Sequence, residues 1–306
     1  MMESHTNKIH LRIFGAHGIT TDLQTWMSTD KLKTMYDKEV ILTRGNDYTH
    51  AIIINTHMPE LTIPKENVVS IAHEPRPHLF NGEHHLMEFT EYAQKHISKC
   101  FVGDKEDLPD PFVEGPSYFF FNCAHYYYKP KSKFCSIVVS TRNVGLNYAY
   151  RHKLVEAILN TELPIDIYGY GVEFYKNIND ERIKHKLENT YINPFGTEPF
   201  EDYKFHICIE NVISNNYFSE KIINPLLSNN IPIYYGCRSI NNYFNDIIKL
   251  TGNVDEDIRI LTQVYNNQTE YKNKNEYETV LETTNLFTHL HNLFDTIRLN
   301  PHSGSP

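Results

Sequence analysis

Strand-like and helix-like segments alternate along this chain, and this alternation constrains the fold more than any other feature of the sequence. In the N-terminal half, the short apolar runs rich in β-branched residues lie at 9–14, 40–43, 51–55, 68–72 and 97–102. Polar, helix-compatible segments separate them, for example 23–36 and 84–96. Strands that alternate with helices form βαβ units around a parallel sheet. The first half of the chain therefore predicts a parallel α/β domain.

The segment 104–133 breaks this alternation. It contains aromatic clusters at 118–121 and 126–128, and prolines at Pro109, Pro111, Pro116 and Pro130. Proline spacing without periodicity is typical of a connection between domains. We expect the aromatic side chains to pack into a domain interface rather than to bind a ligand.

The alternation restarts after this connection. Strands are predicted at 134–140, 164–168, 205–209 and 231–235, and helices at 150–159, 220–229, 255–265 and 271–299. The predicted organisation is an N-terminal domain over 1–130, a second domain over 131–270 and a helical segment over 271–306 that is a candidate to pack back on the first domain. A pair of βαβ domains places a ligand cleft between them, at the carboxyl ends of the strands.

Composition excludes several classes of protein. The 306 residues are 40% hydrophobic and 22% charged, which is typical of a globular protein, and the formal net charge of −9 argues against nucleic acid as a partner. A local basic pocket for a diphosphate remains compatible with that charge. No apolar run approaches the roughly 20 residues of a transmembrane helix, and the N-terminus lacks a signal-peptide pattern. We therefore expect a cytosolic protein.

Cysteine and histidine do not form a metal-binding pattern in this sequence. The cysteines are odd in number and scattered, without a CxxC pair, so we expect free, mostly buried thiols and no zinc site. They are Cys100, Cys123, Cys135, Cys208 and Cys237. The histidines at 84–85 and at 289 and 291 lack a supporting cysteine or carboxylate and are interpreted as surface residues.

The segment 203–236, YKFHICIENVISNNYFSEKIINPLLSNNIPIYYG, carries the most chemical information. A strand runs into Glu210 and Asn211, and after a polar loop Ser219 can cap a helix that opens with Glu220 and Lys221. A helix N-terminus attracts anions, and a cation in the first turn opposes the helix dipole unless an anion is bound there. A diphosphate at this position removes the conflict for Lys221, and Glu220 can then accept hydrogen bonds from a ribose. The alternative is a capped surface helix with both side chains solvated.

This segment resembles the signature of the α-1,3-fucosyltransferases, glycosyltransferase family ten. That signature is a strand ending in Glu-Asn, a variable loop, Tyr-x-Thr-Glu-Lys at a helix start, and a strand with Pro-Ile or Pro-Val before Gly. The counterparts here are Glu210-Asn211, Tyr217-Phe218-Ser219-Glu220-Lys221, Ile231-Pro232-Ile233 and Gly236. Ser219 replaces the usual threonine and keeps its hydroxyl, and Val212 stands where serine is frequent. The resemblance covers about residues 134–236. Within the family, the chain is most similar in type to the short soluble bacterial and viral members.

The resemblance implies a GT-B-like fold, with two Rossmann-like domains facing each other across a cleft, and a donor site in the C-terminal half. It implies that Asn211, Tyr217, Glu220 and Lys221 bind the donor, with Glu210 and Ser219 as further candidates. It also implies that Arg151, which opens a helix after the first donor-domain strand, contacts the donor phosphates. A guanidinium grips two phosphate oxygens at once and stays charged. Arg142 is a rival for this role, and an exposed helix arginine is the alternative interpretation.

The catalytic base is predicted in the N-terminal half, where the resemblance is thin. The family places a base glutamate after a strand comparable to residues 69–72, and Glu74 takes that place in this chain. His73 and His57 are alternative bases. The alternative is that Glu74 only caps a turn, since its flanking residues differ from the family pattern.

The implied reaction is the inverting transfer of a sugar from a nucleotide donor, with GDP-fucose favoured, to a hydroxyl of a glycan acceptor. A base removes the acceptor proton and cations stabilise the departing diphosphate, so a divalent metal is not required. The acidic run 255–257 resembles a metal-binding Asp-x-Asp motif only superficially and suits a helix start. The alternatives are another donor such as UDP-xylose, an inactive module that binds nucleotide or glycan, and a phosphatase or nucleotidase.

Overall fold

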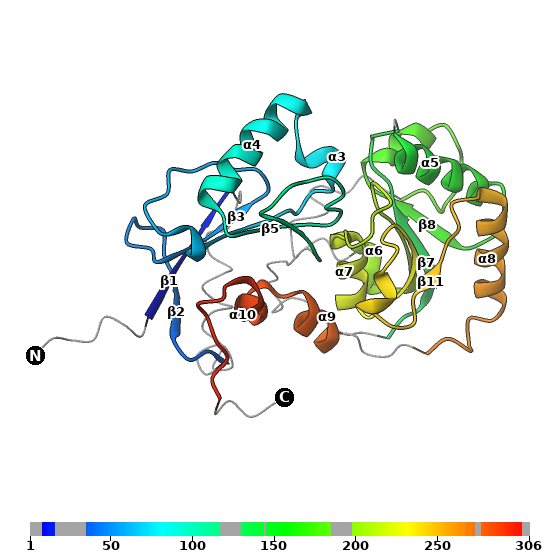
Figure 1. Ribbon diagram of the computed structural model, residues 1–306. Coiled ribbons are helices and arrows are strands. Elements are labelled where there is room, and N and C mark those ends of the chain that lie inside the picture. Colours follow the sequence, from blue (N-terminus) through cyan, green and yellow to red (C-terminus); the bar gives the residue numbers. More distant parts are fainter. Residues whose placement is uncertain are drawn as a thin grey trace, which may run out of the picture. The chain divides into compact units, whose positions relative to one another are not determined.

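The computed structural model of the protein describes residues 8–15, 35–116, 130–143, 145–184, 198–272 and 277–301 (Figure 1). The chain divides into two compact units, residues 1–122 with 284–306, and residues 123–283. Each is a parallel α/β domain, as the sequence predicts. Most of the predicted helix at 23–36, both aromatic clusters and Cys123 lie outside the described residues. No helix in the described ranges has the length and apolar character needed to cross a bilayer.

The first unit contains a six-stranded sheet in the order β2-β1-β3-β4-β5-β6. Every strand pair in it is parallel. The strands are β1 Lys8–Phe14, β2 Glu39–Leu42, β3 His50–Ile54, β4 Val68–Ile71, β5 Lys99–Val102 and β6 Phe112–Glu114. The segment 104–133 is therefore not only a connection, because β6 lies within it and pairs with β5. Its three residues follow Pro109 and Pro111 and are too short to show a strand pattern.

Helices cover both faces of the first sheet. On one face, Phe89 and Ala93 of α4 Gly82–His96 pack with Ala51 and Ile53 of β3. On the other face, η5 Leu286–His289 and α10 Leu290–Leu293 pack against a second core that contains Ile52. Alternate residues of β3 thus point to opposite faces, as the twofold period of a strand requires. Figure 1 shows α4 and α10 on opposite sides of these strands. Two short helical segments, η1 Lys65–Asn67 and α3 Arg76–Leu79, flank β4.

The predicted continuous helical stretch at 271–299 is wrong, because the structure has α9 Tyr277–Thr284 and then the separate η5 and α10. Asn285 breaks the stretch. Its backbone is extended, with φ −71° and ψ 121°, and its side chain accepts a hydrogen bond from the Phe287 N–H. An Asx-type bond of this kind stops one helix and caps the next.

The second unit contains a five-stranded sheet in the order β11-β10-β9-β7-β8. All of its pairs are parallel. The strands are β7 Lys133–Val138, β8 Ile165–Tyr168, β9 Tyr203–Ile209, β10 Ile231–Tyr235 and β11 Ile248–Lys249. Sequence analysis missed β11, which has only two residues. The chain runs from β7 outward to β8 and then returns to the other side of β7 as β9. Open α/β sheets bind ligands beside the carboxyl ends of the strands at such a reversal.

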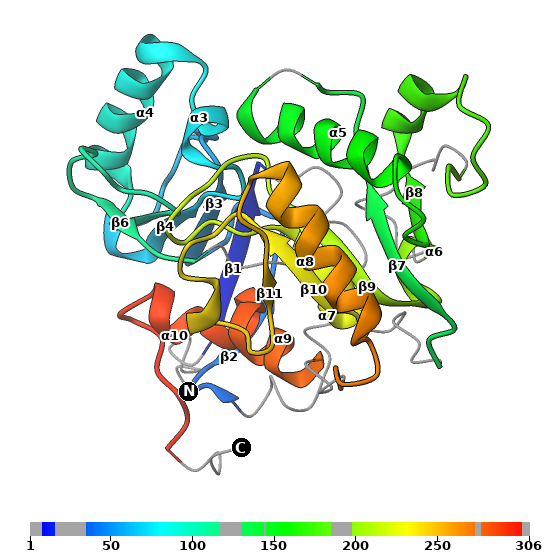
Figure 2. The ribbon, with the colours of Figure 1, turned by 90° about the vertical axis from the view of Figure 1, so that its right-hand side faces the viewer.

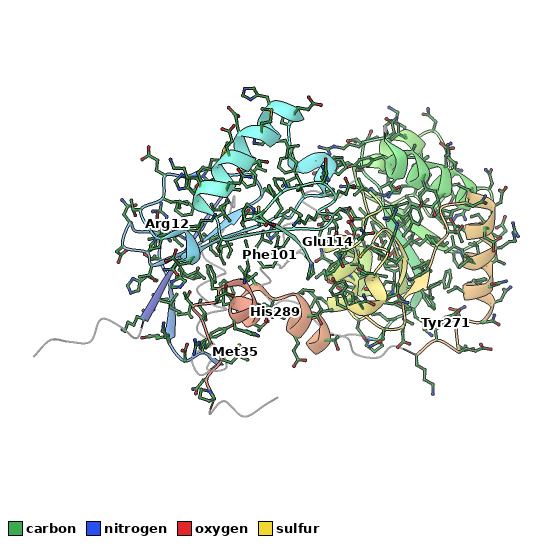
Figure 3. All side chains as sticks on the ribbon, viewed as in Figure 1. Arg12, Met35, Phe101, Glu114, Tyr271 and His289 are labelled. Atoms are coloured by element: carbon green, nitrogen blue, oxygen red, sulfur yellow. The ribbon has the colours of Figure 1, made fainter. Side chains whose placement is uncertain are left out.

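Helices cover both faces of this sheet as well. Side chains of α5 Leu146–Leu159 and α8 Val254–Asn266 form one core with β7, β9 and β10. Tyr271, which Figure 3 labels, belongs to the residues packed against this core. Its ring lies edge-on to that of Phe205, with the ring centroids 5.5 Å apart. Figure 2 shows α8 lying across this sheet. The helix α7 Glu220–Leu227 contacts β9 and β10 without joining that core, so it covers the opposite face. The remaining elements are η3 Tyr170–Tyr175, α6 Glu198–Glu201 and η4 Ile240–Asn242.

Buried polar side chains and thiols complete the two cores. The prediction of free, buried thiols is confirmed for Cys100, Cys135, Cys208 and Cys237. In the second unit, the buried His206 ring bonds Ser136 Oγ through Nδ1 at 2.8 Å, and burial lowers the pKa of His206 from 6.5 to about 3. In the first unit, burial and the Lys38 charge lower the pKa of His50 to about 4.

These histidines make the fold sensitive to acid. Below pH 6.5 the unfolded chain binds protons that the neutral, buried rings do not, so the free energy of unfolding falls as pH falls toward the folded-state pKa values. Each ring is expected to remove about 2 kcal/mol between pH 7 and pH 5. Urea unfolding at these pH values measures the loss, and a His206→Asn variant should lose part of the pH dependence in the second unit. The exposed His84 provides the control His84→Gln, which should behave like the wild type; an equal free energy of unfolding at both pH values contradicts this expectation.

Candidate functional site

The predicted donor residues follow the carboxyl ends of β7 and β9 in the second unit. Glu210 and Asn211 follow β9 directly, and a loop then leads to Ser219 and the start of α7. Arg142 lies in the loop after β7, and Arg151 lies on the helix that follows this loop. The sheet reverses its strand order between β7 and β9, so these residues belong to the part of the unit where a ligand is expected.

The start of α7 is built as the sequence predicts. Ser219 is the N-cap, and its Oγ accepts a hydrogen bond from the Lys221 N–H at 3.3 Å. The carboxylate of Glu210 accepts from the Ser219 N–H and from the Ser219 hydroxyl, at 2.9 and 2.6 Å. Glu210 and Ser219 are buried, at 0% and 1% exposure. Burial raises the pKa of Glu210, and the neighbouring Lys221 charge only partly opposes this.

Lys221 and Glu220 form an ion pair at the helix start. Lys221 Nζ lies 2.8 Å from Glu220 Oε1, 3.2 Å from Ser219 Oγ and 4.0 Å from Glu210 Oε2. The Lys221 side chain is 14% exposed and that of Glu220 is 33% exposed, so both reach the surface at this end of the sheet. Burial alone would raise the pKa of Glu220, but the Lys221 ammonium and local hydrogen bonds hold it below its ordinary value. The cation is thus fixed at a helix start where it opposes the dipole.

Arg151 is buried, at 3% exposure, and its guanidinium donates to the Ile209 carbonyl and to Asn211 Oδ1, the latter at 3.5 Å. Both acceptors lie at the end of β9. Its charged carbon also lies 5.6 Å from the ring centroid of Tyr148. Among the described residues, Arg151 has no carboxylate partner. A buried guanidinium with only neutral partners is costly unless an anion joins it.

The prediction that Arg151 opens its helix is wrong, because α5 begins at Leu146 and places Arg151 in its second turn. The helix starts early because Gly145, with φ 107°, turns the chain into it. Arg142 is exposed and donates to Tyr148 Oη at 3.3 Å, so the Tyr148 ring contacts both arginines. Sequence analysis missed Tyr148, whose aromatic position on a helix beside two arginines was the available signal.

The loop between β9 and α7 is held by internal bonds. The Tyr217 side chain is buried, at 3% exposure, and its N–H donates to Ser214 Oγ at 3.1 Å. Asn216 Oδ1 accepts from the hydroxyls of Ser239 and Tyr243, each at 2.8 Å, which ties this loop to the segment after β10. The backbone around Asn211 and Glu220 is therefore fixed from both sides.

The candidate base lies at the carboxyl edge of the first sheet. Glu74 is exposed and follows β4, and the backbone N–H groups of His73 and Glu74 donate to Asn55 Oδ1 at 2.8 and 3.2 Å. Asn55 directly follows β3 and has φ 55°, a conformation that asparagine tolerates. His57 is exposed two residues later. All three candidates for the base thus follow the adjacent strands β3 and β4, and sequence analysis missed Asn55, which fixes their turn.

The acidic run 255–257 lies in the first turn of α8, where acidic residues suit the helix dipole. Asp257 is buried, and both of its oxygens are occupied. Oδ1 accepts from the Thr251 N–H and hydroxyl at 2.7 and 2.9 Å, and Oδ2 accepts from the Gly252 N–H and Tyr150 Oη at 3.0 and 2.7 Å. These bonds give Asp257 a structural role, in joining α8 to α5 and to the turn after β11.

Comparison with known proteins shows what the second unit is similar to. Residues 128–273 match the family model described as glycosyltransferase family 10 (fucosyltransferase) C-term. The putative fucosyltransferase R654 of Acanthamoeba polyphaga mimivirus is 32% identical over 123 residues, 39% of this chain and 18% of the relative. The alpha-(1,3)-fucosyltransferase FucT of Helicobacter pylori is 28% identical over 156 residues, 50% of this chain and 24% of the relative. The resemblance found in the sequence is thus confirmed, although the matches span only a minor part of each relative's length.

The fold class follows from a solved structure that matches over nearly the whole length of both chains. The structure of Anabaena Alr3699/HepE in complex with UDP-glucose has a TM-score of 0.57 at 10% identity, and the match covers 94% of this chain and 98% of that chain. An alpha1,3-fucosyltransferase with GDP-fucose has a TM-score of 0.46 at 16% identity, covering 93% of this chain and 85% of that chain. The predicted GT-B class, with two parallel α/β domains, is confirmed.

Proposed function

Because residues 128–273 match glycosyltransferase family 10, we propose that this protein transfers L-fucose from GDP-fucose to a hydroxyl of a glycan acceptor, with inversion at the anomeric carbon. The observation that carries the proposal is the buried Arg151. Arg151 lies near the point where the strand order reverses, and its guanidinium has no carboxylate partner among the described residues. The guanidinium donates hydrogen bonds to the end of β9, at the Ile209 carbonyl and Asn211 Oδ1. An anionic ligand at this point would balance the charge.

We propose that different residues of this site bind different parts of the nucleotide sugar. Arg151, Lys221 and the N-terminus of α7, with its helix dipole, are proposed to bind the diphosphate and stabilise the charge that develops on it as it leaves. Glu220, with its depressed pKa, is ionised at neutral pH and suits the ribose hydroxyls. Asn211 is proposed to contact the donor beside Arg151, and Arg142 is a second candidate cation. Tyr217 is proposed to hold the loop between β9 and α7 in place.

On the first unit, Glu74 is the proposed general base, with His73 and His57 as rivals. The base would take the proton of the acceptor hydroxyl as its oxygen attacks the anomeric carbon. Since a diphosphate is a good leaving group and cations are provided by side chains, we propose that no divalent metal is needed. Activity should therefore persist in EDTA, and a complete loss that manganese restores would contradict this part of the proposal.

Nucleotide titration tests the donor site directly. By calorimetry, the wild type is expected to bind GDP at least tenfold more tightly than UDP. Arg151→Ala should weaken GDP binding by about thirtyfold or more, because removing one partner of a buried charge contact costs about 2–5 kcal/mol. Arg151→Lys keeps the charge but loses the planar guanidinium, so its GDP affinity should lie between those of the wild type and Arg151→Ala. Tighter binding of UDP would point to another donor, and GDP binding without hydrolysis or transfer of GDP-fucose would point to an inactive binding module.

A further inference from the structure

Glu210 is a fully buried carboxylate at the end of β9, and its surroundings are shaped to hold it in one position. The Glu210 N–H donates to the Tyr235 carbonyl at 2.9 Å, and its own carbonyl accepts from Asn147 Nδ2 at 3.1 Å. Gly236 leaves the space that the side chain fills, since a Cβ there would lie 2.5 Å from Glu210 Cγ and 2.7 Å from Glu210 Cβ. These contacts fix both the backbone and the side chain of Glu210.

Both carboxylate oxygens of Glu210 accept hydrogen bonds from Ser219, the N-cap residue of α7. Oε1 accepts the Ser219 N–H and Oε2 accepts the Ser219 hydroxyl proton. A serine hydroxyl has a single proton. Because that proton is given to Glu210, the lone pairs of Ser219 Oγ face the other way, toward the N–H and the ammonium of Lys221 at 3.3 and 3.2 Å.

The result is a chain of contacts from the buried carboxylate of Glu210 to the ammonium group of Lys221, whose side chain is 14% exposed. Lys221 Nζ lies 4.0 Å from Glu210 Oε2, so charge attraction acts along the same path as the hydrogen bonds. The long, flexible lysine side chain carries rotamer entropy that such contacts remove before a ligand arrives. Glu210 itself is 0% exposed and is covered by Ser219 and Lys221, so a ligand at the helix start would meet Lys221 and not Glu210.

We propose that Glu210 is a positioning residue for the donor diphosphate: it orients Ser219 and, through it, holds Lys221 and the start of α7 ready, without touching the donor. This rests on the proposed function for the role of the diphosphate, but the hold on Lys221 is a property of the free protein. The two can therefore be tested separately.

The test compares Glu210→Gln with the wild type and with Glu256→Gln, which changes an exposed carboxylate of α8 that pairs with Arg259. In the free protein, the rate at which acetic anhydride labels Lys221 is measured by quantitative mass spectrometry. Glu210→Gln is expected to raise this rate at least threefold, because the glutamine side chain carries no charge and its NH₂ group, which cannot accept a hydrogen bond, replaces one of the two oxygens that hold Ser219. GDP affinity measured by calorimetry should fall 10- to 100-fold, and the KM for GDP-fucose should rise while kcat changes less than threefold. Glu256→Gln should change none of these values.

A purely structural role for Glu210 gives a different result. It would lower the melting temperature and the active fraction but leave the Lys221 labelling rate of the folded protein and the KM unchanged, and that outcome overturns the proposal. If Glu210→Gln does not fold, Gly236→Ala keeps the charge and displaces the side chain, and the same rise in labelling and loss of GDP affinity are expected. If the wild type binds no GDP, the proposed function fails, and the labelling rate alone decides whether Glu210 holds Lys221.

Discussion

Replacing Lys221 with alanine is expected to lower kcat for sugar transfer by two to three orders of magnitude, the largest loss expected from any single side chain of the donor site. The ammonium lies at the start of α7, fixed by Glu220 and Ser219. A preorganised charge aimed at a developing anion contributes about 2.7–4 kcal/mol to the rate in comparable sites. Release of GDP from GDP-fucose, measured with and without a panel of glycan acceptors, would report the loss.

The control for this prediction is Lys153→Ala, which removes an exposed lysine from α5 in the same unit and should leave the rate unchanged. A cation in the first turn of a helix opposes its dipole, so alanine does not weaken α7 as a helix. The lost contacts to the two neighbouring carboxylates cost some stability, and circular dichroism must confirm that the variant is folded at the assay temperature. A folded Lys221→Ala protein with near wild-type turnover would refute the phosphate role.

The fold class could be predicted because the signals are local and repeated. Buried parallel strands such as β3 and β9 consist mostly of apolar residues, and polar helix-compatible segments flank them in the sequence. The strands that escaped prediction, β6 and β11, are short, and pairing with a neighbour rather than their own sequence defines them. The break at Asn285 also escaped, because one side-chain hydrogen bond decided it against a long helix-compatible pattern.

The candidate site was predictable only to the extent that it is a linear motif. Ser219, Glu220 and Lys221 are adjacent in sequence, and capping chemistry identifies the helix start they form. The contacts of Arg151 with the end of β9 join residues about 60 positions apart, so no local pattern reveals that it is buried. The role of Glu210 depends on the missing Cβ of Gly236, which is likewise invisible before the strands are paired.

Replacing Glu74 with glutamine is expected to lower kcat by about two to four orders of magnitude while the affinity for GDP stays within threefold of the wild type. Glutamine keeps the size of the side chain but cannot accept a proton, and general base catalysis contributes about 10²- to 10⁴-fold. The turn should survive, because the Glu74 backbone N–H and its acceptor Asn55 are unchanged. Single-turnover rates with GDP-fucose and calorimetry with GDP give the two quantities.

The same measurements on neighbouring residues decide between the candidate bases. Glu60→Gln changes another exposed carboxylate of the first unit and should retain full activity. If His73 or His57 is the base instead, the collapse should appear in His73→Asn or His57→Asn and not in Glu74→Gln. A loss of GDP affinity with normal turnover in Glu74→Gln would contradict its assignment, because a base acts on the acceptor proton and has no part in holding the nucleotide. A selective loss of turnover would instead place the acceptor hydroxyl at the carboxyl edge of the first sheet, where β3 and β4 present all three candidates.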